Sequence, residues 1–398
     1  MKITGIKIYR HTIRYKSAFP GGERSVAPRD IYGGFDASSW VRMIEEKLDE
    51  ATERDTEAMF LFVTTDEGIT GVHGPIEYRA ELLTAAETLA PVIEGRDPLD
   101  NRMLWDMMLR CERHARSGIT LMAIGAVDIA LWDLKGKILG KPVYKLIGGG
   151  REKLRPYASA LGFSVEPRQA AKQAISIKRM GIGAQKWFFR HGPDDGPAGI
   201  EKNLELAYSL RETLGDDYTL MFDCWMGWTV PYAETMLRGL ERVRPMWVEE
   251  ALRPHYIEAW KLLKSSASVP LSAGEHLYTR FEVNAYLREG IFSVMQSDPD
   301  WCGGITEALR IADLCELYGT LFIPHGHSLH PAMHVVASMP PDVCPYVEYL
   351  LSSMHRKSSF FKAKPLSKDG YLYLGEEPGL GYEFDMERIT RTVEIKFT

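Results

Sequence analysis

The fold is decided by a stretch that reads YTLMFDCW at residues 218–225, PMWVEEAL at 245–252 and PLSAGEHL at 270–277. Each of the three runs is short and apolar, and each carries a carboxylate close to its end. The segments between them show helical spacing with charged faces. An apolar strand, a helix and another strand, repeated about every 25 residues, are typical of parallel βα units. This stretch therefore predicts an α/β fold.

The same pattern continues along the chain in both directions. Further apolar runs lie at residues 154–162, 184–189, 292–298, 320–326 and 346–350. Helical spacing is found between runs, for example at residues 232–242, 257–265 and 305–317. Seven or eight such units close into a barrel, whose active site lies at the carboxyl ends of the strands. We therefore expect a TIM-like barrel over the second part of the chain.

Nearly every predicted strand ends with one ionisable residue. These residues are Lys186, Asp223, Glu249, Glu275, Asp298, His325 and Glu348. The first two steps after Asp223 are both 26 residues long, and the later ones are 23, 27 and 23. Because strand ends of a barrel converge on one face, we expect these side chains to meet there.

Composition indicates an ordinary globular protein. The chain has 398 residues, enough for two or three domains, with 45% hydrophobic and 26% charged residues. A net charge of −6 gives no reason to expect nucleic acid or an anionic membrane as a partner. Its five scattered cysteines fit neither a zinc site nor a disulfide framework. With no signal peptide and no long apolar stretch, we expect a cytoplasmic protein.

The N-terminal part has a different pattern. Residues 1–16 alternate as a strand, residues 58–74 read as a hairpin, and residues 124–138 have apolar positions on one helical face. Between strand and hairpin, residues 17–38 form a long polar loop. Loops of this length are usually functional or disordered. Its Arg24, Arg29 and Tyr32 could bind a polyhydroxy ligand or could simply be solvated.

The three carboxylates Asp223, Glu249 and Glu275 predict a metal site. Adjacent parallel strands lie about 4.8 Å apart, so the three groups would repel each other unless a cation lay between them. All-oxygen ligation favours Mg²⁺. Only one residue of the pair Glu249 and Glu250 is expected to point inward, because strand side chains alternate, and the equal spacing favours Glu249. The alternative is that each carboxylate pairs with a nearby arginine or lysine, such as Arg253 or Arg244.

A histidine and an aspartate follow on the next strands. Asp298 beside His325 would fix the tautomer of the imidazole and raise its basicity, which makes His325 a general acid or base. His327 and His330 in the same loop, and His276 next to Glu275, could contact a substrate, but nothing selects among them.

Two further residues complete the predicted site. Lys186 could neutralise negative charge that develops on a carboxylate substrate, or it could pair with a structural acid. Glu348 could donate a hydrogen bond to an enolate oxygen if its pKa were raised, or it could form a salt bridge.

These residues and motifs resemble the enolase superfamily, mandelate racemase subgroup. The supporting motifs are AIGAVDIALWDLKGKILGKPVYKLIGG, FDCW, WVEEAL, AGEH, DPDWCGG, PHGHS and PGLGYEFD. Within the subgroup, KWFFRHGPDDGPAG and DPDWCGGI look most like L-rhamnonate dehydratases. The resemblance implies an α+β capping domain (1–150), a (β/α)7β barrel (151–358) and a segment that returns to the cap (359–398). It also suggests a homo-oligomer.

The resemblance also implies roles for the site residues. Asp223, Glu249 and Glu275 would bind Mg²⁺, and Lys186, Asp298, His325 and Glu348 would be catalytic. A small acid-sugar substrate would be held by the loop that carries Arg24, Arg29 and Tyr32 and by barrel loops such as 188–200. His191 in that barrel loop, and His276, are further expected contacts.

One departure from the racemase pattern favours dehydration. Racemases of this subgroup carry a second lysine two positions after the first, and here that position is Phe188. Phe188 cannot accept a proton, so only His325 remains as a base. We expect a Mg²⁺-dependent acid-sugar dehydratase. The alternatives are a racemase, epimerase or cycloisomerase on the same scaffold, and a non-catalytic sugar-acid-binding protein.

Overall fold

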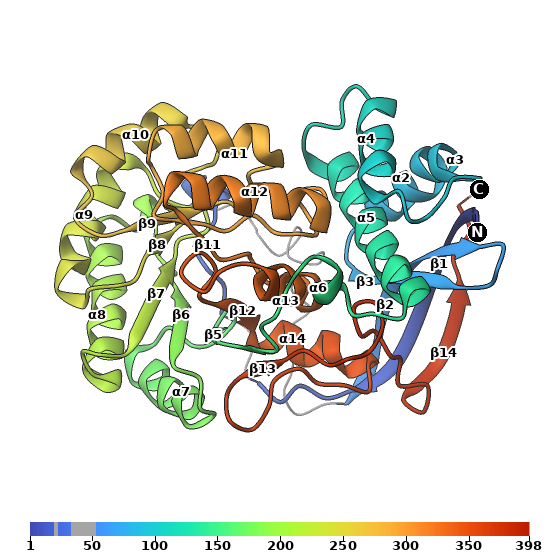
Figure 1. Ribbon diagram of the computed structural model, residues 1–398. Helices are drawn as coiled ribbons and strands as arrows, with labels where there is room; N and C mark the ends of the chain where they lie inside the picture. The colour runs from blue at the N-terminus through green and yellow to red at the C-terminus, as the bar shows by residue number, and fades with distance from the viewer. Residues whose placement is uncertain (20–22, 33–52, 398) are drawn as a thin grey trace.

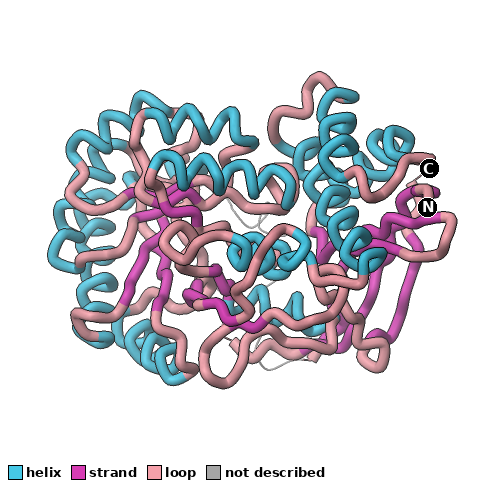
Figure 2. Tube along the Cα trace, in the orientation of Figure 1, coloured by secondary structure: helices cyan, strands magenta, loops and turns pink. Residues whose placement is uncertain are grey.

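The computed structural model describes residues 1–19, 23–32 and 53–397. Two parts lie side by side in Figure 1, a larger barrel surrounded by helices and a smaller part that contains both chain ends. Figure 2 shows the barrel strands inside the ring of helices. The predicted architecture, a TIM-like barrel with an α+β capping domain, is confirmed.

The capping domain contains a four-stranded antiparallel sheet in the order β14-β1-β2-β3. Its strands are β1 (Ile3–Tyr15), β2 (Arg54–Thr65), β3 (Thr70–Ile76) and β14 (Ile389–Glu394). The predicted hairpin is confirmed as the antiparallel pair β2 and β3. The helical segments of the capping domain are α2 (Arg79–Thr84), η2 (Ala85–Leu89), α3 (Ala90–Ile93), α4 (Asn101–Cys111), α5 (Gly118–Leu139) and α6 (Val143–Leu146).

The barrel is an eight-stranded parallel sheet in the order β11-β10-β9-β8-β7-β6-β5-β12. Its strands are β5 (Pro156–Ser159), β6 (Ala184–Phe188), β7 (Thr219–Asp223), β8 (Val248–Glu249), β9 (Leu271–Ala273), β10 (Val294–Met295), β11 (Leu321–Phe322) and β12 (Val347–Leu350). The helices outside it are α7 (Pro167–Arg179), α8 (Gly196–Leu214), α9 (Val230–Leu240), α10 (Ile257–Ser266), α11 (Thr279–Arg288), α12 (Ile305–Tyr318), α13 (Leu329–Ser338) and α14 (Leu351–Lys357).

Short elements connect the larger ones. They are β4 (Lys153–Leu154), which pairs with β13 (Leu372–Tyr373), and the single turns η1 (Pro28–Ile31), η3 (Pro193–Asp195), η4 (Glu241–Val243) and η5 (Ser358–Phe360). The β4–β13 pair joins the start of the barrel to the C-terminal segment.

Helix α5 is the buried central helix of the capping domain. It ends at Leu139, and the left-handed conformation of the following Gly140 (φ +61°) stops the helix. The carboxylate of Asp133 accepts hydrogen bonds at 2.8 Å from the backbone N–H groups of Val72 and Leu380. Asp133 therefore ties α5 to both the cap sheet and the C-terminal segment.

The same helix docks the cap onto the barrel. Asp128 of α5 accepts hydrogen bonds from the backbone N–H and the hydroxyl of Thr306, at 2.9 and 2.6 Å. Thr306 lies in the first turn of α12, where backbone N–H groups lack partners within the helix. Gly304 at the start of this helix has φ +94°, and a Cβ added there would lie 2.3 Å from Asp128 Oδ2. The two domains therefore approach too closely for a larger residue.

The barrel interior is filled with apolar side chains. Tyr157, Ala184, Met221, Trp247, Val294 and Ile323 form one buried cluster. Trp247 also donates a hydrogen bond from Nε1 to Glu249 Oε2 at 3.0 Å. The cluster therefore forms a floor beneath the polar residues at the strand ends.

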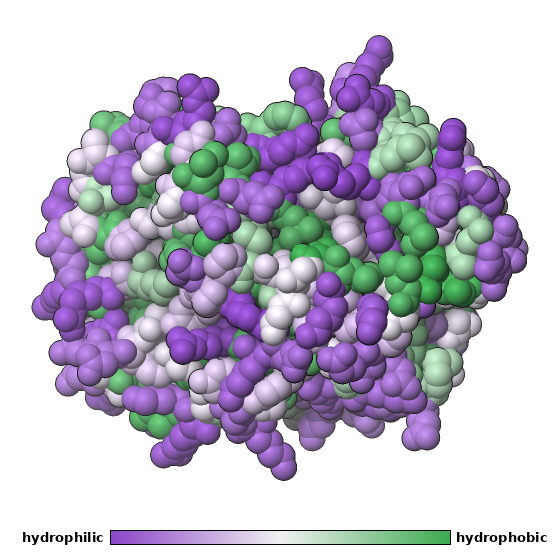
Figure 3. All heavy atoms as spheres, viewed as in Figure 1, coloured by the Kyte–Doolittle hydropathy of each residue, from purple (hydrophilic) through white to green (hydrophobic). Residues whose placement is uncertain are grey.

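On the face shown in Figure 3, polar residues dominate the outer surface, and apolar residues gather near the middle and over part of the cap. Among the described residues, no helix combines the length and the apolar character that crossing a membrane requires.

Candidate active site

The predicted ionisable residues meet at the carboxyl ends of the barrel strands. Asp223 and Glu249 are the last residues of β7 and β8, and they are paired in register. Lys186 and Glu348 lie within β6 and β12. The remaining residues, Glu275, Asp298 and His325, follow β9, β10 and β11 within three residues.

Lys186 is buried and surrounded by carboxylates. Its Nζ lies 2.6 Å from Glu249 Oε1, 2.9 Å from Glu348 Oε1 and 3.6 Å from Asp223 Oδ2. Burial opposes the charged form, but Glu249 and Glu348 outweigh it, so the pKa of Lys186 is raised. Lys186 is therefore a fixed positive charge at the centre of the site.

Glu348 is stabilised as an anion. Its Oε2 accepts the backbone N–H of Gly326 at 3.0 Å, and Lys186 holds its other oxygen. Burial raises its pKa, but Lys186 and His325 outweigh burial and lower it. Of the two roles considered from sequence, the salt bridge agrees with this geometry and the protonated hydrogen-bond donor does not.

Three carboxylates at the site are only partly compensated by positive charge. Burial raises the pKa of Asp223 to about 6 and that of Glu249 to about 7, against the opposing effect of Lys186. Burial also raises the pKa of Glu275 to about 7, although His325 opposes it. In each case neighbouring carboxylates add to the shift. An oxygen-rich donor set with an excess of negative charge fits a divalent cation such as Mg²⁺.

The two neighbouring glutamates, Glu249 and Glu250, have different partners at the site. Glu249 bonds Lys186, Trp247 and Gln296, while Glu250 lies 2.9 Å from Nδ1 of His276. Both glutamates are buried. Strand alternation does not extend to Glu250, because β8 ends at Glu249 and Glu250 has a φ of +44°.

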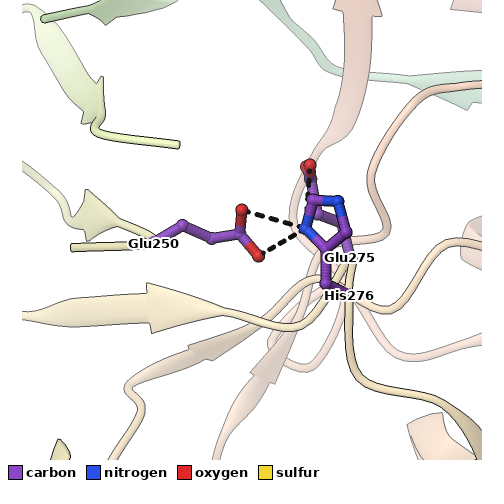
Figure 4. A group of neighbouring side chains, drawn as sticks. All are labelled: Glu250, Glu275 and His276. Carbon is purple, nitrogen blue, oxygen red and sulfur yellow. Dashed lines mark hydrogen bonds and ion pairs between the residues drawn. The ribbon is translucent and has the colours of Figure 1, made fainter. Parts of the chain in front are cut away.

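Glu250 brings a second group of possible ligands to the site. Glu250, Glu275 and His276 each offer a ligand atom, and these atoms lie within 4.8 Å of one another. In Figure 4, Glu250 and His276 point toward each other, and Glu275 approaches the imidazole from another side. Glu275 belongs to this group, whereas the predicted trio of Asp223, Glu249 and Glu275 is not such a group in the part of the chain that the structure describes.

His325 and Asp298 form the expected pair. Nδ1 of His325 lies 2.7 Å from Asp298 Oδ2, while Nε2 lies 3.4 Å from Glu275 Oε2 and 4.0 Å from Glu348 Oε2. Burial lowers the pKa of His325, but Glu275, Glu348 and Asp298 together raise it to about 10. When Nδ1 donates to Asp298, Nε2 is the nitrogen that faces the site.

The other histidines of this region have separate surroundings. His276 bonds Glu250, and His327 bonds Asp300 through Nδ1 at 2.6 Å. His330 is enclosed by aromatic rings, and burial lowers its pKa to about 4. Of these three histidines, His276 is the one that lies next to Glu250 and Glu275. The sequence alone did not select it.

The residues predicted to bind the sugar lie in loops around the barrel mouth. The N-terminal loop is joined to the barrel by a 2.8 Å hydrogen bond from the Val26 N–H to the Phe189 carbonyl. Arg24 pairs with Asp30 of the same loop at 2.7 Å, and Tyr32 is 68% exposed. Residues 20–22 and 33–38 of the predicted loop lie outside the described residues.

Arg29 and His191, like Arg24 and Tyr32, show no direct link to the central carboxylates. Arg29 lies in the turn η1, and the ring of His191 lies 3.2 Å from Asp195 in its own loop. His191 also receives a hydrogen bond to its backbone carbonyl from Asn203 at 2.9 Å. The loop of His191 is therefore anchored to α8.

Sequence reasoning missed residues that lie beside His325 and His327. Glu77 of the capping domain lies 3.3 Å from Nε2 of His327. The Trp301 ring lies over His325 at 5.0 Å between centroids and over His327 at 5.1 Å. One signal was available, since Asp298 and Asp300 have the same spacing as His325 and His327.

Comparison with known proteins agrees with this geometry. Residues 168–388 match the family described as Enolase C-terminal domain-like, and residues 42–148 match the mandelate racemase / muconate lactonizing enzyme N-terminal domain. The chain is 33% identical over 336 residues to L-rhamnonate dehydratase of Saccharopolyspora erythraea, covering 81% of each chain.

Two solved structures are similar over nearly their whole length. L-Rhamnonate dehydratase from Gibberella zeae has a TM-score of 0.80 at 26% identity, covering 99% of this chain and 96% of that one. A racemase from Streptomyces coelicolor A3(2) with bound magnesium has a TM-score of 0.77 at 25% identity, covering 97% and 98%. The expectation of an enzyme is confirmed, and the chain belongs to the mandelate racemase and muconate lactonizing enzyme family of the enolase superfamily.

Proposed function

We propose that this protein is a Mg²⁺-dependent dehydratase of an acid sugar, an aldonate such as L-rhamnonate or a relative. The observation that carries the proposal is that the site offers one catalytic base, His325, which is held by Asp298. The position of a second base is filled by Phe188. Phe188 is 1% exposed and has no group that can exchange a proton. The similarity to dehydratases named for L-rhamnonate supports the substrate class.

The chain's own groups can carry out both halves of the reaction. A cation held by Glu275 would offset the charge that does most to raise the pKa of His325, and would leave Nε2 unprotonated. Nε2 then takes the proton from C2, next to the substrate carboxylate, and the C–H electron pair forms an enediolate. The electrons then expel the hydroxyl at C3, which leaves as water after protonated His325 returns the proton. The resulting enol becomes a 2-keto-3-deoxy acid. Asp298 stabilises the imidazolium between the two steps, since it holds Nδ1 at 2.7 Å.

Positive charge makes the C2 proton more acidic. A divalent cation held by Asp223, Glu249 and Glu275 would supply that charge beside the substrate carboxylate. Lys186, fixed among the same carboxylates, stabilises the enediolate as its charge develops. Glu348 holds Lys186 in place at 2.9 Å. His276, which faces Glu250, is the proposed contact for a substrate hydroxyl.

The identity of the third metal ligand can be tested with a matched pair of variants. Glu249→Gln and Glu250→Gln each remove one negative charge without changing side-chain size, and both positions are buried. If Glu249 is the ligand, titration calorimetry with Mg²⁺ will show a much weaker affinity for Glu249→Gln than for Glu250→Gln. The reverse order would assign the ligand role to Glu250.

The decisive experiment for the function is a screen of acid sugars that detects 2-keto acid formation. The active sugar is then turned over in deuterium oxide, and unreacted substrate is recovered at partial conversion. We expect 2-keto-3-deoxy product and substrate with unchanged configuration at C2. Recovered substrate that is epimerised would reveal a second base and support an isomerase, the activity class of the similar racemase from Streptomyces coelicolor. His325→Asn should abolish either reaction.

A further inference from the structure

Two histidine–aspartate pairs stand next to each other at the ends of β10 and β11. Asp298 bonds Nδ1 of His325 at 2.7 Å, and Asp300 bonds Nδ1 of His327 at 2.6 Å. All four residues are buried. The first pair is the proposed base, while the second has no part in the reaction described above.

The second pair holds the aspartate of the first. Oδ1 of Asp298 accepts the backbone N–H of Asp300 at 2.7 Å, and Oδ2 accepts the backbone N–H of His327 at 3.0 Å in addition to His325. Two of these three N–H donors therefore belong to the second pair. The orientation of the Asp298 carboxylate, and with it the imidazole of His325, depends on where Asp300 and His327 lie.

The second pair is in turn anchored to the capping domain. His73 on β3 has its Nε2 3.2 Å from Asp300 Oδ1, and Glu77, which follows β3, has its Oε2 3.3 Å from Nε2 of His327. Lys357 lies 3.2 Å from the other oxygen of Glu77. The second pair is thus linked by polar contacts to β3 of the other domain and to the residue that follows this strand.

The ring nitrogens of His327 face away from the central carboxylates. Nδ1 bonds Asp300 and Nε2 faces Glu77 of the capping domain, whereas Nε2 of His325 faces Glu275 at the site. Trp301 lies over the rings of both His325 and His327 and keeps them in one packed group. This arrangement indicates that His327 acts through the neighbouring pair of His325 and Asp298 and does not contact the substrate directly.

We infer that His327 and Asp300 form a positioning pair, which orients His325 through Asp298 and makes that orientation depend on the contacts of this pair with His73 and Glu77 of the capping domain. The inference rests on the proposed role of His325 as the base. Glu77 and His73 are then residues that influence the chemical step without touching the substrate.

Two variants and one control test the inference in the Mg²⁺-loaded enzyme. Glu77→Ala removes the carboxylate that pairs with His327, and the Glu77 side chain is 41% exposed. Asp300→Asn removes the negative charge that faces His73 and His327. Loss of such an outer partner lowers activity about 10–100-fold, and here we expect the loss in kcat with KM nearly unchanged. Asp128→Asn weakens a different contact between the domains and should leave kcat as it is.

A spectroscopic measurement provides a test that does not need a substrate. In protein labelled with ¹⁵N-histidine, the Nδ1–H proton of His325 gives a downfield resonance because its bond to Asp298 is short. We expect this resonance to move in Glu77→Ala and Asp300→Asn and to stay in place in Asp128→Asn. If no acid sugar is turned over by the wild-type enzyme, the proposed function fails while the resonance still decides the positioning role.

Two results would overturn the inference. One is a His325 resonance and a kcat that are both unchanged in Glu77→Ala and Asp300→Asn. The other is an equal effect in Asp128→Asn, because the base would then respond to any loosening of the two domains and not to this pair.

Discussion

Replacing Asp298 by asparagine is the most direct test of the proposed catalytic role of the His325–Asp298 pair. Asp298 accepts three N–H donors, whereas an amide has only one oxygen and places an NH₂ group at the other end. If the NH₂ replaces Oδ1, it faces the Asp300 N–H. If it replaces Oδ2, it faces the His327 N–H, and its contact with His325 survives only when the imidazole hydrogen moves to Nε2. A histidine protonated on Nε2 cannot take the C2 proton.

Both orientations of the amide reduce the rate. The first keeps the tautomer of His325 but removes the negative charge that stabilises the imidazolium, and the second removes the base. We expect kcat to fall about 10²–10⁴-fold, which corresponds to about 3–5 kcal/mol in the activation free energy. Either orientation also leaves a buried backbone N–H without an acceptor, at about 1–3 kcal/mol of the free energy of unfolding.

The assay compares Asp298→Asn with Asp133→Asn. Asp133 is also fully buried and also accepts two backbone N–H groups, but in the capping domain. Steady-state turnover of an active acid sugar is measured together with urea unfolding. The two variants should lose similar stability, and only Asp298→Asn should lose activity. An Asp298→Asn enzyme with the kcat of the Asp133→Asn control would refute the assigned role.

Three further predictions concern the metal, the domain contact and the loop. Mg²⁺ at 100 times its dissociation constant should raise the free energy of unfolding by about 2.7 kcal/mol, and EDTA or Asp223→Asn should remove this effect in thermal unfolding. Gly304→Ala should lower the free energy of unfolding by about 2–4 kcal/mol, because it strains the backbone and displaces Asp128. The control is Gly319→Ala, where φ is +66° and the added Cβ meets open space, and it should lower the free energy of unfolding by about 1–2 kcal/mol. Urea unfolding measures both. Val26→Asp places a charge in a fully buried contact of the N-terminal loop, so KM for the sugar should rise while stabilisation by Mg²⁺ persists.

The barrel could be predicted because its strands are buried on both faces. Such strands appear as continuous apolar runs, and LMF at 220–222 is a clear example, with all three residues fully buried in β7. A polar residue directly after such a run marks the strand end, as Asp223 does. The spacing of these ends along the chain then indicates which side chains converge at the barrel mouth.

The conformation at strand ends could not be predicted in the same way. Alternation decides which side chain points inward only while the backbone is extended, and β8 contains just two residues. Glu250 adopts a positive φ, which is uncommon for a residue other than glycine. Nothing in the letters WVEEAL distinguishes this geometry from a longer strand.

Contacts between residues of the two domains could not be predicted from the sequence pattern either. Glu77 and His327 are 250 positions apart, and they meet only because β3 of the cap reaches the end of β11. Each residue read alone is a surface glutamate or one histidine among several. The repeated interval of two in Asp298, Asp300, His325 and His327 was visible, but its meaning depends on which strands are neighbours.

The pairing of β1 with β14 has a consequence for how the chain folds as it is synthesised. Tyr15 ends β1 and Ile389 begins β14, so 373 residues separate the two strands. At about 5–20 residues per second, translation of that interval takes roughly 20–75 s. Throughout this time β1 can pair with β2, but its opposite edge has no partner strand. An open edge of this kind can recruit strands from other chains, so nascent protein is most exposed to aggregation before β14 has been synthesised.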